Sequence, residues 1–180
     1  GIQCFFIDSK NKLWIGTSEG VSIYDAVLDN FIQSKLDPTR NERLSNNHVT
    51  AIARDKNGEI WVATHGGLYK VISETPLRYQ HYVHEEGNQK SLIDNEVRSL
   101  FMDKTGELWI GTAVGVSKLI KSNDGSIEFI NYRLPSLQLK GKSWINCLSE
   151  NDNGKLLIGT EDDGVKVLDK ASGSITALKL

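Results

Sequence analysis

The chain has 180 residues, of which 39% are hydrophobic and 24% charged, and its 21 Lys and Arg residues nearly balance 23 Asp and Glu residues. Charges of both signs are interspersed, so no basic stripe favours nucleic acid or an anionic membrane as a partner. No apolar run approaches the roughly 20 residues of a transmembrane helix, so we expect no direct membrane insertion of this segment. The chain begins at Gly1, inside the first strand pattern, and we expect it to be part of something longer.

A four-fold repeat organises the sequence. The stretch Leu108–Thr112 reads Leu-Trp-Ile-Gly-Thr, and related stretches stand at 13–17, 60–64 and, without the Trp, at 156–160. Their second residues, Trp14, Trp61, Trp109 and Leu157, are 47, 48 and 48 residues apart. One supersecondary unit is therefore present four times. We expect the four units at residues 1–35, 48–84, 95–133 and 143–180.

Each unit has the pattern of four short strands separated by turn signals, and none shows the 3.6-residue period of a helix. In chain order the predicted strands are 2–7, 13–17, 21–24 and 30–34; 49–54, 60–64, 68–71 and 78–83; 97–102, 108–112, 116–120 and 127–132; and 145–149, 156–160, 165–168 and 174–178. The stretches between units, at 36–47, 85–95 and 134–142, are predicted to be loops.

The first turn of each unit has a defined chemistry. It begins with an acid or its amide, namely Asp8, Asp55, Asp103 and Asn151. Such a side chain caps a turn by accepting hydrogen bonds from the following backbone. The fourth position, Gly58 in the second unit, is predicted to take a positive φ, and Asn11 in the first unit tolerates that conformation best among other residues.

Three consecutive apolar residues in the Trp-bearing strand indicate that both of its faces are covered. Small four-stranded sheets covered on both sides by copies of themselves are the blades of a β-propeller, so we predict an all-β fold of four antiparallel blades. One position stays small in every unit, at Gly16, Ala63, Gly111 and Gly159, where a neighbouring blade is expected to approach closely. Cys4 and Cys147 occupy equivalent small positions on different blades, which are expected to be too far apart for a disulfide.

At this point the residues resemble a known family. The second unit contains Asp55-x-x-Gly58-Glu59-Ile60-Trp61-Val62-Ala63-Thr64-x-x-Gly67, and the third contains Asp103-x-x-Gly106-Glu107-Leu108-Trp109-Ile110-Gly111-Thr112-x-x-Gly115. Both resemble the two-component regulator propeller repeat, as does the preceding Leu92-x-x-Asn95-x-Val97. The fourth unit departs from the pattern, because Leu157 replaces Trp and the loop at 161–163 is one residue longer.

The resemblance implies a sensor. Such repeats form propellers in the periplasmic part of hybrid two-component sensor histidine kinases of Bacteroides-type bacteria, many of which respond to glycans. We therefore expect a non-enzymatic, periplasmic, ligand-sensing segment with an oligosaccharide ligand. The alternatives are a protein-interaction or dimerisation scaffold with no ligand of its own and, less favoured, a propeller lyase or glycosidase.

The resemblance also implies a ring wider than four blades. An open arc would expose one apolar blade face at each end, and apolar surface of that size is not normally left in water. We therefore expect either a partial propeller or half of a ring closed by a second chain, and hence a homo-oligomer.

The candidate ligand residues lie at positions whose residue type differs from one unit to the next. In a propeller, the connectors that lead into the innermost strands share one face with the loops that follow the second strands, and we call it the upper face. Three of these residues directly precede the innermost strands: His48, Glu96 and Trp144. Four stand one residue inside those strands: Arg98 and Asn146, and also Gln3 and Thr50. His65 lies in a loop. A Trp beside amides and an Arg suits a sugar, whose ring stacks while its hydroxyls meet polar groups. The structural alternatives are that Trp144 packs against a neighbouring blade and that the polar residues line a solvated channel.

No metal, cofactor or catalytic residue is predicted. His48 and His65 lack a carboxylate or Cys at ligand spacing, which makes them a weak zinc signal. The acidic run at 161–163 is interpreted as a solvated loop rather than a calcium site. The sequence contains no nucleophile, metalloprotease or phosphate-binding motif.

Overall fold

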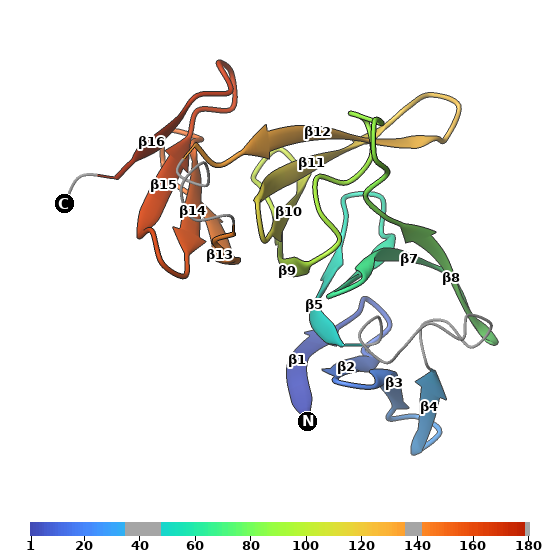
Figure 1. Cartoon of the computed structure of the whole chain (residues 1–180). Coiled ribbons are helices and arrows are strands. Elements are labelled where there is room, and N and C mark those ends of the chain that lie inside the picture. The colour runs from blue at the N-terminus through green and yellow to red at the C-terminus, as the bar shows by residue number, and fades with distance from the viewer. Residues whose placement is uncertain (35–47, 136–141, 179–180) are drawn as a thin grey trace.

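The structure, a computed structural model, describes residues 1–34, 48–135 and 142–178. These residues form sixteen strands and no helix, and the strands build four sheets of four strands each (Figure 1). Each sheet is antiparallel, with its strands in the order of the sequence, so the predicted all-β fold of four blades is confirmed. The predicted loop residues 36–47 and 136–141, and residues 35, 179 and 180 of the predicted blades, lie outside the described residues.

In each blade the first strand is innermost and the fourth outermost. The first two blades consist of β1 (Ile2–Ile7), β2 (Leu13–Thr17), β3 (Gly20–Asp25) and β4 (Asn30–Ser34), and of β5 (Val49–Arg54), β6 (Ile60–Thr64), β7 (Gly67–Glu74) and β8 (Leu77–Tyr82). The last two consist of β9 (Val97–Met102), β10 (Leu108–Thr112), β11 (Gly115–Lys121) and β12 (Ile127–Arg133), and of β13 (Ile145–Glu150), β14 (Leu156–Thr160), β15 (Val165–Leu168) and β16 (Ile175–Ala177).

A single side chain anchors the first hairpin turn of each blade. In the second blade, Oδ1 of Asp55 accepts hydrogen bonds from the backbone N–H groups of Asn57 and Glu59, both at 2.9 Å. Gly58 has a φ of 83°, a conformation that most side chains disfavour. Asn11 takes its place in the first blade with a φ of 61°, so the predicted turn chemistry is confirmed.

The same carboxylate also binds the tryptophan of its blade, a contact that the repeat pattern did not lead us to predict. Oδ2 of Asp55 accepts a hydrogen bond from the indole Nε1–H of Trp61 at 3.0 Å, and both groups are buried. The equivalent bonds join Trp14 to Asp8 at 3.0 Å and Trp109 to Asp103 at 2.9 Å. Each aspartate therefore caps the turn with one oxygen and satisfies the indole with the other.

The fourth blade lacks both partners of this bond. Oδ1 of Asn151 still caps the turn, accepting from the N–H groups of Asn153 and Lys155 at 3.0 and 2.9 Å. The other polar atom of an Asn side chain is an amide nitrogen, which donates and so cannot accept from an indole N–H. Leu157, which needs no acceptor, stands in place of Trp. The two departures of this copy are thus one coupled chemical change.

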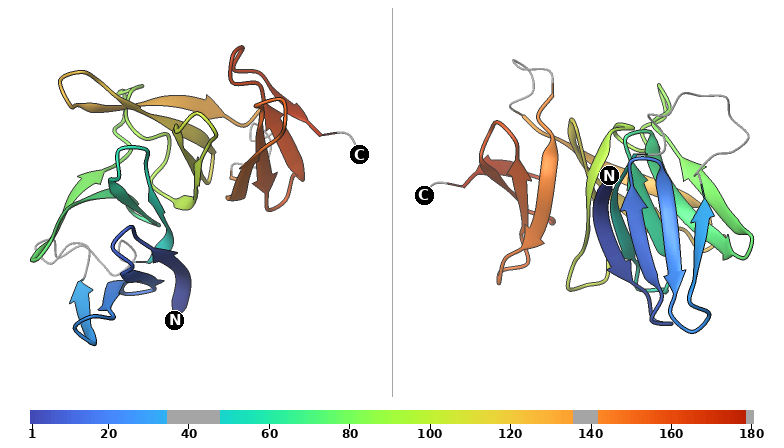
Figure 2. Two further views of the ribbon diagram at one scale, coloured as in Figure 1. Left: turned by 180° about the vertical axis from the view of Figure 1, so that it is seen from behind. Right: turned by 90° about the horizontal axis from the view of Figure 1, so that it is seen from below.

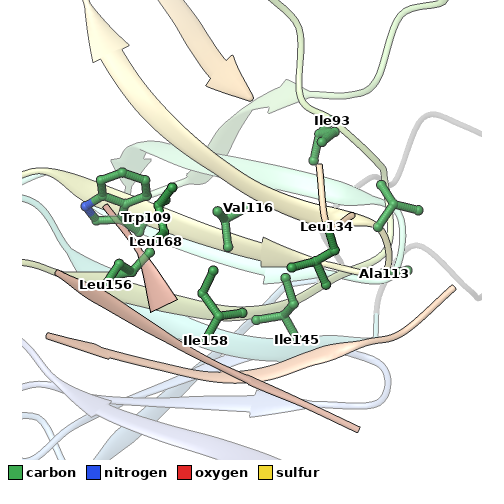
Figure 3. Packing of buried hydrophobic residues seen from close by; sticks show 10 residues of the cluster. Ile93, Trp109, Ala113, Val116, Leu134, Ile145, Leu156, Ile158 and Leu168 are labelled. Carbon is green, nitrogen blue, oxygen red and sulfur yellow. The ribbon is translucent and has the colours of Figure 1, made fainter. Parts of the chain in front are cut away.

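The tryptophan defines the two faces of a blade. Trp14 packs in one cluster with Val49, Ile60 and Val62 of the second blade, so it points toward the next blade in the chain. We call this the forward face, and the opposite face, which receives the tryptophan of the preceding blade, the back face. Figure 3 shows the equivalent cluster between the third and fourth blades, where Trp109 lies beside Leu156 and Leu168.

The extent to which the second strand of a blade is buried depends on how many neighbouring blades cover it. All five residues of β6 and of β10 are buried, so the prediction of two covered faces is confirmed for the middle blades. In β2 only the forward-pointing Trp14 and Gly16 are buried, and in β14 only the back-facing Leu156 and Ile158. The first blade therefore has an open back face and the fourth an open forward face.

The small position of the second strand is where adjacent blades approach. A Cβ atom placed on Gly16 would lie 2.6 Å from Cγ1 of Val49, and one on Gly111 would lie 2.7 Å from Cγ2 of Ile145. Both neighbours belong to the next blade, which confirms the predicted close approach at these two positions. A larger residue there would force the blades apart.

The innermost strands β1, β5, β9 and β13 lie side by side in that order. Hydrogen bonds cross between them: the Thr50 hydroxyl donates to the C=O of Val97, and the Ser99 hydroxyl to the C=O of Ile145, both at 2.9 Å. The blades fan out from these strands as an arc that is not closed into a ring, with the two ends of the chain at its opposite ends (Figures 1 and 2). The predicted partial propeller is confirmed, and closure by a second chain stays a prediction.

The cysteines of the first and last blades, Cys4 and Cys147, are both free thiols. In the parts of the chain that the structure describes, no helix has the length and apolarity of a membrane span.

Candidate functional site

The upper face brings together five of the six predicted ligand residues. His48, Glu96 and Trp144 directly precede β5, β9 and β13, Arg98 is the second residue of β9, and His65 follows β6. These five side chains are linked by the ring contacts, ion pair and electrostatic interactions described below. We call them the upper-face cluster.

Two histidines form one end of the cluster. The rings of His48 and His65 stack with their centroids 4.3 Å and their planes 5° apart, and the N–H of His65 donates to the C=O of His48 at 3.2 Å. Burial lowers the pKa of His65, and the positive potential of His48 and Arg98 lowers it further. The neutral imidazole of His65 is therefore favoured at pH 7.

An ion pair forms the middle of the cluster. Nη2 of Arg98 donates to Oε1 of Glu96 at 3.0 Å, and Nζ of Lys142 lies 3.3 Å from Oε2 of the same carboxylate. Burial alone would raise the pKa of Glu96, but the hydrogen bonds and charges of Arg98 and Lys142 outweigh it and lower the pKa. One carboxylate thus faces two cations, which leaves this part of the upper face net positive.

Trp144 forms the other end of the cluster. The Cζ atom of Arg98 lies 4.9 Å from the centroid of the Trp144 ring, a cation–π arrangement that joins the third blade to the fourth. The ring is half-buried beside the apolar cluster between these two blades, in agreement with the alternative in which Trp144 packs against a neighbouring blade. Because Arg98 occupies one ring face, stacking of a sugar on that face would require Arg98 to move.

Three buried nitrogen atoms of the cluster have no hydrogen-bond partner among the described residues. They are Nε of Arg98, Nε1 of Trp144 and Nε2 of His65. The first two are obligate donors, and leaving a buried donor unpaired costs about 1–3 kcal/mol. A molecule that offers oxygen acceptors, such as hydroxyl or carboxylate groups, would satisfy them once the side chains that bury these atoms move aside.

The remaining predicted positions have other surroundings. Asn146 has an exposed side chain, and no hydrogen bond within the described parts of the chain joins it to the cluster. The hydroxyl of Thr50 is used in the bond to the next blade described above. Lys142 was missed, because it stands in a connector without a repeating pattern; its place two residues before Trp144 was the one available signal.

The structure does not bring metal ligands together at this face. Among residues 1–34, 48–135 and 142–178, no group of three or more His, Cys, Asp or Glu side chains is placed to hold a metal ion. In the acidic loop, Asp163 pairs with Lys166 at 2.9 Å, and Glu161 and Asp162 are exposed to solvent.

Two open clefts lie away from the upper-face cluster. One of about 680 Å³ lies between the first and second blades and is lined by Lys10, Lys12, Glu59, Lys70 and Glu74 among others. Another of about 670 Å³ lies between the connector at 84–90 and β12. The charged groups of the first cleft are paired: Lys10 and Lys12 with Glu74 across the blade boundary, both at 3.1 Å, and Lys70 with Glu59 within the second blade at 2.7 Å. Such pairing indicates that these charged groups have a structural role. The first cleft is therefore a weaker candidate for a ligand site than the upper-face cluster, despite its volume.

Comparison with known proteins agrees with this architecture. The sequence profile of the two-component regulator propeller family matches residues 43–66 and 91–113. These ranges contain the Trp-bearing hairpins of the second and third blades. The chain therefore contains two-component regulator propeller repeats.

Solved structures with a similar fold agree with the match to this family. The chain is similar to the extracellular domains of two proteins of B. thetaiotaomicron described as hybrid two-component systems, BT3049 and BT4673. The TM-scores are 0.79 and 0.72, the identities 23% and 25%, and the matches cover 99% and 97% of this chain but 24% and 22% of those chains. The chain thus spans about a quarter of the length of these domains. It is a β-propeller segment of the kind found in the extracellular domains of hybrid two-component systems.

The fold is also shared with an enzyme. Virginiamycin B lyase from Staphylococcus aureus matches with a TM-score of 0.71 and 15% identity over 100% of this chain and 56% of the lyase. At that identity the likeness concerns the fold alone. A search of curated proteins found no match.

Proposed function

We propose that this chain is a non-catalytic, ligand-sensing segment of the periplasmic part of a hybrid two-component sensor, and that its upper-face cluster binds a glycan-derived ligand. The observation that carries the proposal is the pair of buried donors on Arg98 and Trp144 that have no partner among the residues the structure describes. They stand beside the stacked rings of His48 and His65 and a net positive ion-pair group. Ligand binding would favour one arrangement of the blades over another and so shift an equilibrium that a sensor can transmit.

A sugar oxygen suits this site better than an apolar group does. Sugars present many hydroxyl oxygens on a rigid ring, and acidic sugars add a carboxylate that pairs with an Arg guanidinium. Because Arg98 covers one face of Trp144, the first contacts of the ligand are hydrogen bonds rather than ring stacking.

The proposal is tested by calorimetric titration of the chain with a panel of neutral and acidic oligosaccharides. Binding of at least one class is expected. Arg98→Ala should weaken it about 10- to 100-fold, because a hydrogen bond from a charged donor contributes about 1.5–3 kcal/mol. Trp144→Phe keeps an aromatic side chain, though a smaller one, but removes the Nε1 donor, and it should weaken binding about two- to ten-fold.

Arg78→Ala is the matched control, because it removes an exposed Arg from the outermost strand of the second blade. It should leave the affinity unchanged. A panel without any binder would contradict the ligand class, and a binder equally affected by Arg78→Ala and Arg98→Ala would contradict the site.

A further inference from the structure

Every innermost strand contains a β-bulge at the same position. In each of them one residue is skipped in the register with the second strand, and the four skipped residues are Gln3, Thr50, Arg98 and Asn146. A bulge re-aims the side chain of the extra residue. Thr50 reaches the next blade, where its hydroxyl donates to the C=O of Val97 at 2.9 Å. Arg98 reaches the next blade in the same way, with its Cζ atom 4.9 Å from the ring centroid of Trp144.

The guanidinium that the bulge delivers is only partly used. Among the residues that the structure describes, its one hydrogen bond runs from Nη2 of Arg98 to Oε1 of Glu96 at 3.0 Å. A guanidinium can instead hold both oxygens of one carboxylate through two parallel N–H groups, and Nε and Nη2 form one such edge. Nε of Arg98 has no partner within the described parts of the chain. Glu96 therefore occupies one donor of an edge that can hold two oxygens.

The charges around this guanidinium also leave room for one more anion. The second oxygen of Glu96 lies 3.3 Å from Nζ of Lys142, so a single carboxylate serves two cations. The side chains of Arg98 and Glu96 are 29% and 22% exposed, so solvent reaches the pair without fully screening it. A second carboxylate would give each cation an anion of its own. The third and fourth blades both build this group, so it does not rely on a sheet face left open at either end of the arc.

From the unused donor edge and the excess of one cation, we propose that the ligand of the upper-face cluster carries a carboxylate, as uronic acids do, and that this carboxylate replaces Glu96 on Arg98. The inference rests on the proposed function and adds to it a ligand class and an internal competitor. The exchange breaks the bond from Nη2 to Glu96 and forms two bonds from Nε and Nη2 to the ligand. Lys142 keeps Glu96. No covalent bond changes.

A neutral sugar would give Glu96 the opposite role. A carboxylate only accepts hydrogen bonds, and sugar hydroxyls donate them, so Glu96 would then hold the ligand directly. Neutralising Glu96 strengthens the binding of a carboxylate ligand by removing its competitor. The same change weakens the binding of a neutral ligand by removing an acceptor. The sign of this effect separates the two ligand classes.

The test is calorimetric titration of the full 180-residue chain with oligosaccharides of galacturonic acid and of glucuronic acid, each beside its methyl ester. Esterification removes the charge and leaves the hydroxyl groups in place. The acids should bind at least about ten-fold more tightly than the esters, because hydrogen bonds between charged groups are the stronger ones. Glu96→Gln should tighten the binding of the acids about two- to five-fold, the range of a partly exposed ion pair.

Two further variants separate the donor edge and the exchange from general electrostatics. Arg98→Lys keeps the charge but loses the planar fork, and it should weaken the binding of the acids about ten-fold. Glu161→Gln is the matched control for Glu96→Gln. Glu161 is an exposed acid whose N–H donates to the C=O of Trp144 at 2.9 Å, and among the described residues its carboxylate has no ion pair with Arg98 or Lys142. It removes the same charge and should change the affinity by less than about two-fold.

The outcomes that overturn the inference are distinct. Acids that fail to bind, or bind no better than their esters, beside a neutral sugar that binds would reject the carboxylate and leave the glycan site standing. Weaker binding of the acids to Glu96→Gln, or an equal gain in Glu161→Gln, would reject the exchange. Full affinity in Arg98→Lys would reject the two-bond contact. A chain that binds no sugar, neutral or acidic, would overturn this inference and the proposed function together.

Discussion

The hydrogen bond between Asp55 and Trp61 predicts that substitutions of the two residues are strongly coupled. Trp61 is fully buried, and its indole N–H donates to the buried Asp55 carboxylate at 3.0 Å. Burial of roughly 150–250 Å² of Trp surface at about 25 cal/mol per Å² stabilises the fold by about 4–6 kcal/mol as an upper bound. A buried Leu recovers about 1.5–3 kcal/mol of this. Trp61→Leu also leaves Oδ2 of Asp55 unpaired, which costs about 1–3 kcal/mol more.

The second substitution is Asp55→Asn, which keeps the turn-capping oxygen but places an amide nitrogen against the indole donor. Alone it should cost about 1–3 kcal/mol. The double variant reproduces the pair of residues in the fourth blade, Asn151 with Leu157, and avoids the mismatch that each single variant creates. It should therefore be more stable than the sum of the single effects predicts, by about 1–3 kcal/mol.

Urea unfolding followed by circular dichroism measures the four free energies of unfolding. As a control, Asp55→Asn is combined with Trp109→Leu in the next blade, where no bond joins the two residues; these effects should add within about 0.5 kcal/mol. A coupling of the bonded pair no larger than that of the control pair would refute the role assigned to this hydrogen bond.

Three further predictions concern packing and titration. Gly111→Ala should lower the free energy of unfolding by about 1–3 kcal/mol, because its Cβ would overlap Ser99 and Ile145, and added Ser99→Ala should recover part of that in urea melts. Burial alone would raise the pKa of Asp103, but the Lys170 ammonium and further hydrogen bonds outweigh it and lower the pKa below its usual value near 4. The ion pair between Asp103 and Lys170 therefore stabilises the folded state above about pH 4, and this stabilisation is lost as the pH falls. Lys170→Met should lower the free energy of unfolding at pH 7 and have a progressively smaller effect below pH 4, which acid unfolding curves measure. Burial, His48 and Arg98 lower the pKa of His65, so the unfolded chain takes up a proton on this residue more readily than the folded chain does. The folded state should therefore lose stability as the pH falls below about 6.5, and His65→Gln should remove that loss. An NMR titration of the His65 ring is the direct check.

The upper-face cluster was predictable only in part. Position in the repeat placed His48, Glu96 and Trp144 at one level of the arc, because equivalent residues of successive blades lie side by side. The repeat could not show that Arg98 of the third blade covers the ring of Trp144 in the fourth, or that Lys142 shares the carboxylate of Glu96. Those contacts depend on how two blades are placed relative to each other, and no local pattern encodes that placement.

The sequence by itself determined the blades. The Asp and Gly of each first turn and the uninterrupted apolar strand are local signals that act within about a dozen residues, and the interval of 47 or 48 residues between copies shows that the unit is repeated. Only the tertiary structure decided that one aspartate serves both the turn and the indole, that Arg98 covers the ring of Trp144, and that Lys142 shares the carboxylate of Glu96. The contacts of Arg98 and Lys142 join segments that are far apart in the chain. The bond between aspartate and indole joins residues only six apart, but it depends on the direction of two side chains, which residue spacing does not show.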